Sequence, residues 1–282
     1  MNLSDRALLV GVTISLFSGE KTDKRVAEEV ARNHNTTARD AGRFQKAIVS
    51  KKALEDIKHT AGRLRDTHYS LTLPWLNSGE RLLALSAYET YGERIAAIRA
   101  KFDEEVERFV AIYPDLIEDA RRRLNGMFDE ADYPPVSEIR RRFVVDLKVM
   151  PFPNTRNWLT DEWEEVRAEA ERRVQMGIAD ATRDLFDRVA TVTGHMAQKL
   201  RDYDPETKTG IFRDSLVENV RELHALLPSL NVTGDERVNE LSKALSALTH
   251  HDASTLRTDP GFRQDTAAQA ETIYQQAMAL LG

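Results

Sequence analysis

The chain has 282 residues, of which 41% are hydrophobic and 30% are charged, and its formal net charge is -6. This length allows one large core or two smaller ones, and the negative charge argues against indiscriminate binding of polyanions. The chain contains no cysteine, which excludes disulfides, thiolate catalysis and cysteine-ligated metal centres and favours a reducing compartment such as a cytoplasm.

Two segments are predicted to be strands. Hydrophobic side chains alternate with small or polar ones from Val10 to Leu16, which is the period of a half-buried strand. The same alternation returns at residues 143–150, in "FVVDLKVM". We expect the two strands to pair in a two-stranded sheet with helices packed on it, because an isolated pair of strands is marginally stable. The apolar run at residues 7–17 is too short to span a bilayer.

Short helices are predicted at residues 22–35 and 51–68, and "SLTLPWLNSGERLL" follows them at residues 70–83. Pro74 prevents a helix from continuing through Leu73, and Asn-Ser-Gly favours a turn. We therefore interpret residues 70–80 as an elbow, with Trp75 buried to fix its angle and Arg81 in the first turn of the next helix. An exposed Trp75 would instead serve, together with Arg81, as an anchor for a partner protein.

Two long amphipathic helices are predicted next, at residues 82–127 and 160–203. Apolar side chains recur in both at intervals of three and four residues. The second helix would be about 65 Å long at 1.5 Å per residue, which is longer than a globular core. Because the two helices have similar lengths and similar apolar seams, we expect them to form an antiparallel coiled-coil hairpin. Gly177 and Gly194 lie inside the second helix, where either close helix packing or a flexible joint would explain them.

The remaining residues are predicted to form shorter helices separated by Pro228, Gly234 and "RTDPG". The predicted fold class is therefore mostly α with a small sheet (α+β), in three parts. A strand-helix head occupies residues 1–81 and is completed by residues 143–150, a coiled-coil arm occupies residues 82–204, and a C-terminal helical cap occupies residues 205–282.

The sequence contains none of the common catalytic motifs. Phosphate-binding glycine loops, HExxH, GxSxG and EF-hand loops are absent. His250 and His251, followed by Asp252, could offer metal ligands, but adjacent side chains at a helix end point in different directions, so we predict a solvated helix terminus. We predict no catalytic residue, no cofactor and no metal. An enzyme would need a cleft in which distant histidines and carboxylates meet.

Two arginine runs, at residues 121–123 and 140–142, are the densest basic segments. If they shared one exposed face, they would form a small phosphate-binding patch. Three successive helical residues cannot all face one ligand, and no aromatic residues suited to stacking accompany the runs. The candidate nucleic-acid contacts are Arg121, Arg122, Arg140, Arg141 and Arg156.

Several stretches resemble a family of uncharacterised proteins, a domain of unknown function found in bacteriophages, prophages and conjugative elements. They are "GVTISLFSG", "TLPWLNSGERLL", residues 102–134, "VMPFPN" and "FRDSLVENVRELHALLPSLN". The family usually has an acidic-aromatic-arginine triplet after the Pro-x-Pro segment, where this chain has "NTRNWL". Such proteins are often encoded near a MoxR-type AAA+ ATPase or a von Willebrand A-type protein.

Taken together, the residues and the resemblance predict a non-enzymatic helical adaptor or structural protein of a mobile genetic element. The resemblance implies an AAA+ ATPase or a von Willebrand A-type protein as partner, and an amphipathic rod also allows self-association. The alternative is a nucleic-acid-binding accessory protein of phage DNA metabolism that uses the two arginine runs. No membrane partner is expected.

Overall fold

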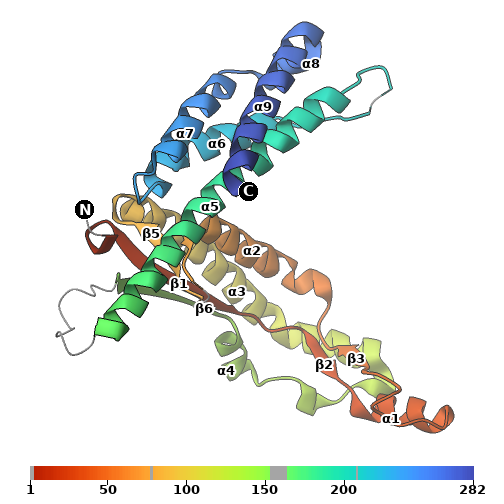
Figure 1. The fold of residues 1–282 in the computed structure, drawn as a ribbon. Helices are drawn as coiled ribbons and strands as arrows, with labels where there is room; N and C mark the ends of the chain where they lie inside the picture. Colours follow the sequence, from red (N-terminus) through yellow and green to blue (C-terminus); the bar gives the residue numbers. More distant parts are fainter. Residues whose placement is uncertain (1–2, 77–78, 153–163, 208) are drawn as a thin grey trace. The chain divides into compact units, whose positions relative to one another are not determined.

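A computed structural model describes residues 3–76, 79–152, 164–207 and 209–282 of the chain (Figure 1). The fold is mostly helical with a small antiparallel sheet, which confirms the predicted fold class at that level. The chain forms two compact units that are interleaved along the sequence. Unit 1 comprises Met1–Gly11, Tyr69–Tyr91 and Lys148–Gly282, and unit 2 comprises Val12–His68 and Gly92–Leu147. The predicted division placed boundaries at residues 81 and 204, with residues 143–150 completing the head.

The two predicted strands are neighbours in a sheet with more strands than expected. They are β1 (Ala7–Ser15) and β6 (Val144–Pro151), in a four-stranded sheet of order β4-β5-β1-β6. β5 (Arg81–Ala84) pairs antiparallel with β1, with Leu9 opposite Leu82. A separate two-stranded sheet joins β2 (Glu20–Thr22) to β3 (Gln45–Ala47). The prediction of a sheet with only two strands was therefore wrong.

The Pro-Trp segment is part of the sheet. β4 (Leu73–Pro74) pairs antiparallel with β5, with Leu73 opposite Leu82. Pro74 is tolerated because β4 is an edge strand, where a missing N–H breaks no ladder. Arg81 begins β5 and does not open a helix, so the prediction of a helix from residue 82 was wrong; that helix begins at Tyr88.

Unit 2 contains α1 (Lys24–Asn33), α4 (Val136–Ile139) and most of α2 (Glu55–Ser70) and α3 (Tyr88–Leu124). The Asp23 side chain accepts hydrogen bonds from the N–H groups of Arg25 and Val26 and thereby caps α1. Pro114 lies inside α3 and does not end the helix. The core of unit 2 includes a cluster of aromatic rings: Phe17, Phe109, Tyr113 and Phe143.

A buried lysine connects three segments of unit 2. The Lys46 side chain is only 3% exposed, and its Nζ lies 2.6 Å from Asp132 Oδ2 and 3.4 Å from Asp23 Oδ2. Nζ also donates a hydrogen bond to the carbonyl of Met127. Because a buried ammonium is costly unless it is paired and hydrogen-bonded, these contacts hold β3 to the N-terminus of α1 and to the segment after α3.

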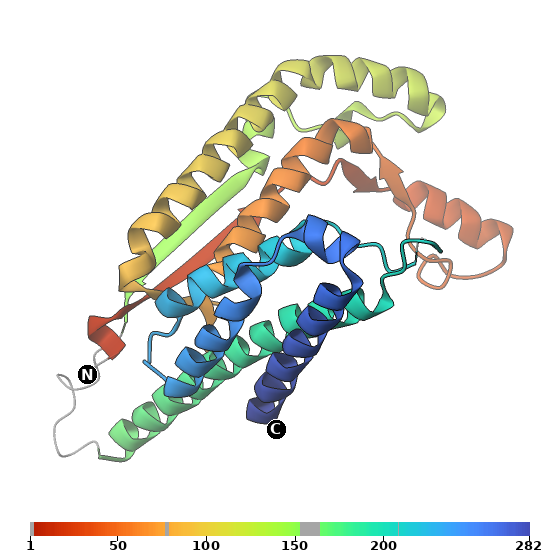
Figure 2. The same ribbon diagram turned by 90° about the horizontal axis from the view of Figure 1, so that it is seen from above.

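Unit 1 is a helical assembly built on α5 (Glu164–Asp202). The other helices are α6 (Ser215–Leu230), α7 (Glu236–Thr249), α8 (Ala253–Thr258) and α9 (Pro260–Leu281). α9 lies along α5, and α6 lies beside α7 (Figures 1 and 2). The predicted coiled-coil hairpin is not confirmed: α5 finds its main partner in α9, and most of α3 belongs to unit 2.

The two glycines inside α5 are sites of close packing. A Cβ atom added at Gly177 would lie 2.6 Å from Trp75 Cζ3, and one added at Gly194 would lie 2.9 Å from Cδ2 of Tyr274, on α9. Trp75 also packs edge-on against Phe152, with ring centroids 4.8 Å apart. Of the two explanations offered by the sequence, close packing describes both glycines.

Candidate functional site

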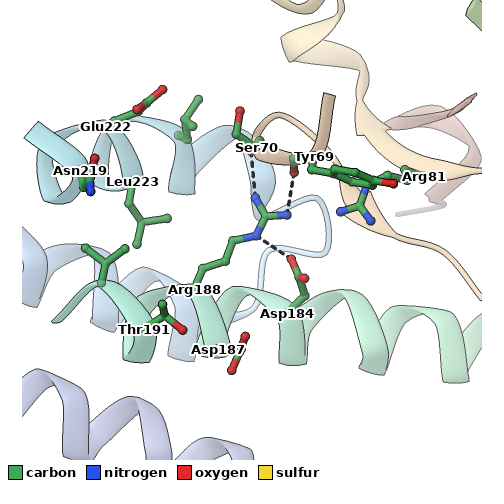
Figure 3. A pocket seen from close by; sticks show the side chains of 12 residues that line it. Tyr69, Ser70, Arg81, Asp184, Asp187, Arg188, Thr191, Asn219, Glu222 and Leu223 are labelled. Carbon is green, nitrogen blue, oxygen red and sulfur yellow. Dashed lines mark hydrogen bonds and ion pairs between the residues drawn. The ribbon is translucent and has the colours of Figure 1, made fainter. Parts of the chain in front are cut away.

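A groove on unit 1 is a candidate binding site. It has a volume of about 550 Å³ and is lined by α5, α6, the last residues of α2 and the start of β5 (Figure 3). This volume falls within the usual range for ligand sites. The lining residues are Tyr69, Ser70, Arg81, Asp184, Asp187, Arg188, Thr191, Val192, Asn219, Glu222, Leu223 and Leu226.

Arg188 closes one wall of the groove by capping α2. Its guanidinium donates hydrogen bonds to the carbonyls of Tyr69, Ser70 and Thr72 at 2.9, 2.9 and 2.7 Å. The last carbonyls of a helix have no intrahelical partner, and the five donors of arginine can serve several of them at once. Asp184 Oδ2 lies 2.7 Å from Arg188 Nε, one helical turn away on α5, and holds the side chain in place (Figure 3). The hydrogen-bonding groups of Arg188 are therefore used within the fold.

Arg81 also uses its hydrogen-bonding groups within the fold. It donates to Thr72 Oγ1 at 2.7 Å and to the Thr72 carbonyl at 3.0 Å, and its guanidinium lies 4.7 Å from the centroid of the Tyr69 ring. Burial, partly offset by the charge of Asp184, lowers the pKa of Arg81 from its ordinary value, but an arginine remains charged throughout the physiological range. The structure thus places Arg81, the predicted partner anchor, in the wall of the groove.

The side chains left to face a ligand are apolar at the floor and polar at the rim. Val192, Leu223 and Leu226 supply apolar surface, while the exposed Asp187 and Thr191 lie on α5 and the exposed Asn219 on α6. The lining residues include no histidine. Such an arrangement is suited to binding an amphipathic group.

Trp75 is buried, with an exposed fraction of 5%. Its ring fills the space above Gly177 and meets Phe152. This position supports the structural interpretation of the Pro-Trp segment, because a partner could not reach the ring without local opening of unit 1.

The arginines of the two runs have different environments within unit 2. Arg121 lies near Glu118 and Glu130 and over the Phe128 ring, and Arg122 lies near Asp119. Arg140 is held by Asp103 at 2.9 Å and Glu107 at 2.7 Å. Arg141 and Arg142 are exposed and line a different cavity. Arg156 and the "NTRNWL" stretch that contains it lie outside the described residues.

The histidine pair shows no sign of a metal site. His251 packs edge-on against Phe262, and burial lowers its pKa from the ordinary value of 6.5. Within the described ranges, no group of three or more His, Asp or Glu side chains is arranged to hold a metal ion.

Comparison with family models, with curated proteins and with solved structures found no significant match. In the part of the chain that the structure describes, no helix combines the length and apolar character needed to cross a bilayer.

Sequence reasoning did not find the groove. The i, i+4 spacing of Asp184 and Arg188 was a visible signal of an ion pair on α5. The acceptors of Arg188 are main-chain carbonyls of a segment more than a hundred residues away in the sequence, and carbonyl positions have no sequence signature.

Proposed function

We propose that the chain is a non-enzymatic helical adaptor protein that binds a short segment of a partner protein in the groove between α5 and α6. The observation that carries the proposal is the combination of an apolar floor, a polar rim and a wall whose two arginines already donate hydrogen bonds to backbone carbonyls. The carboxylate of Asp187 is exposed at this rim, so the groove offers negative charge together with apolar surface.

The occupant that fits best is a basic amphipathic segment. Unit 1 carries 25 Asp and Glu against 18 Lys and Arg, so its field attracts positively charged partners. Recognition of an amphipathic helix in a groove between helices is a common mode of peptide binding, in which apolar anchors provide affinity and charges fix the register.

The identity of the partner is proposed from the resemblance. An AAA+ ATPase or a von Willebrand A-type protein of a mobile genetic element would supply the segment, and the adaptor would act in the cytoplasm of the bacterial host. Self-association through the same groove is the competing outcome. Neither possibility requires the hairpin between residues 82–127 and 160–203.

A charge-reversal pair of variants tests the groove. Asp187→Lys changes the rim, whereas Glu240→Lys makes the same charge change on the exposed face of α7, away from the groove. The protein is captured with its partner from nuclease-treated bacterial extract, and the partner is then purified and titrated. We expect Asp187→Lys to weaken binding by roughly tenfold or more and Glu240→Lys to leave it unchanged.

Four results would overturn the proposal. The first is equal binding by both variants, and the second is a partner that is captured from untreated extract but lost after nuclease treatment. The third is a partner segment that is acidic. The fourth is a titrated species that is a second copy of this chain, because the groove would then be a self-association site.

A further inference from the structure

A second cavity lies wholly within unit 2. It has a volume of about 510 Å³ and lies where β1 ends and β2 begins, beside the residues that precede and open β6. Its lining includes three cations, Lys21, Arg141 and Arg142, and an apolar wall formed by Phe17, Ile48 and Pro134. The Phe17 ring is held by edge contacts with Tyr113 and Phe143, so this wall is set by the core of unit 2.

The arginine triplet of residues 140–142 is divided between two roles. Arg140 is bound by Asp103 and Glu107 and donates to the carbonyl of Phe143. In the described part of the chain, Arg141, Arg142 and Lys21 form no ion pair or side-chain hydrogen bond, and all three are exposed at the cavity. The donors of Arg140 are thus taken up by two carboxylates and a carbonyl of the same unit. Its two neighbours are left available for an external anion.

The carboxylates near the cavity do not cancel this charge. Asp132 lies 2.6 Å from the buried ammonium of Lys46, which Asp23 also contacts at 3.4 Å, so the charge of Asp132 is partly compensated. Glu20 is the other acidic residue of the lining. Two carboxylates, one of them partly compensated, therefore face three cations, and in a partly enclosed cavity this excess concentrates positive potential.

We propose that this cavity binds a nucleoside phosphate unit, with Arg141, Arg142 and Lys21 on the phosphate and the apolar wall against the sugar or base. Arginine is suited to this task because its planar donors match phosphate oxygens in pairs. The unit can belong to a free nucleotide or to a single-stranded nucleic acid, because both present the same chemistry. The site excludes Arg121, Arg122 and Arg140, and it does not depend on the groove of unit 1.

The test compares two double variants with the same loss of charge. Arg141→Gln with Arg142→Gln alters the cavity, while Lys51→Gln with Lys52→Gln alters exposed lysines of unit 2 outside its lining. Each full-length protein is titrated with a labelled oligothymidylate, with ATP and with inorganic phosphate at several salt concentrations. Far-ultraviolet circular dichroism verifies that each variant is folded, and Lys21→Gln provides a separate single variant.

We expect the cavity double variant to bind roughly tenfold or more weakly and to lose about two units of salt slope, one for each phosphate contact. The lysine control should bind like the unaltered protein, and Lys21→Gln should have an intermediate effect. Cavity-dependent binding of ATP would identify a free nucleotide as ligand, and cavity-dependent binding of the oligonucleotide alone would identify a single strand. Equal weakening by the two double variants, or no binding of any probe, would overturn the proposal.

Discussion

At the scale of single residues, the contact between Gly177 and Trp75 makes an unusual prediction about a helical glycine. Replacing glycine by alanine inside a helix normally stabilises it by about 1 kcal/mol. At Gly177 the new methyl group would lie 2.6 Å from the indole ring, so the ring or α5 must shift. We expect Gly177→Ala to lower the free energy of unfolding by about 1–3 kcal/mol, the usual cost of overpacking a core.

The control for this change is Gly92→Ala in α3, where an added Cβ meets nothing within 4 Å. This variant should be more stable than the original protein by about 0.5–1 kcal/mol. Urea denaturation followed by circular dichroism measures both. If Gly177→Ala stabilised the protein as Gly92→Ala does, the close packing of Trp75 against α5 would be contradicted.

The buried cluster of Asp23, Lys46 and Asp132 makes unit 2 sensitive to acid. Burial raises the pKa of Asp23, but the N–H of Val26 and the ammonium of Lys46 together lower it further, so the net pKa lies below the ordinary value of 3.8. A carboxyl group with a lowered folded-state pKa contributes stability that is present above its unfolded pKa and is lost as the pH falls through the folded pKa. We therefore expect unit 2 to lose stability progressively below about pH 4.

Asp23→Asn should flatten the acid side of the stability profile, because it removes one of the groups that must be protonated. Asp66→Asn, at an exposed position of α2, should leave the profile unchanged. Denaturation midpoints measured from pH 2 to pH 7 provide the comparison, in the acid range where carboxyl groups titrate. If the acid slope were identical in Asp23→Asn and in the original protein, the cluster would not be a cause of the loss of stability in acid.

At the scale of elements, the choice of partner for α5 is the feature that the sequence did not reveal. Two amphipathic helices of similar length have compatible seams, and that compatibility led to the predicted hairpin. α5 instead buries Leu185, Val189 and Met196 in a core to which α9 contributes Ala267, Ala270 and Ile273. The small residues of α9 permit close approach to α5, which apolar periodicity alone does not indicate.

A fragment of residues 82–203 distinguishes the two arrangements. If the hairpin were correct, this fragment would be helical and would unfold cooperatively. Because α5 relies on α9, we expect the fragment to lack a cooperative thermal transition by circular dichroism, since an isolated amphipathic helix is marginal in water. Adding residues 204–282 should restore the transition to the part that contains α5. A cooperative transition in the shorter fragment would support the hairpin.

At the scale of the whole molecule, periodicity was enough to locate the longer elements. The alternation of β1 and β6 and the apolar stripes of α5, α6, α7 and α9 are strong local signals. The shorter strands lack such signals: β2 reads Glu-Lys-Thr and β3 reads Gln-Lys-Ala. These strands are specified by contacts with segments that are distant in the sequence. The interleaving of the two units also results from such long-range contacts.

The candidate sites were also only partly predictable from the sequence. The arginine runs were visible in the sequence, but their separation into paired and exposed members depends on carboxylates that lie on α3. The groove of unit 1 depends on two arginines whose acceptors include backbone carbonyls. In both cases the residue type was predictable, and the use made of each residue was determined by tertiary structure.

The central claim is that the groove of unit 1 holds a basic amphipathic segment of a partner protein. The most direct measurement places a photo-cross-linking amino acid at Thr191, inside the groove, or at Glu240, outside it, and maps the cross-linked peptides by mass spectrometry after nuclease treatment. We predict a single partner peptide, rich in lysine or arginine and apolar residues, that is cross-linked from position 191 only and is lost when Asp187→Lys is introduced. Equal cross-linking from both positions, or a peptide that persists with Asp187→Lys, would contradict the claim.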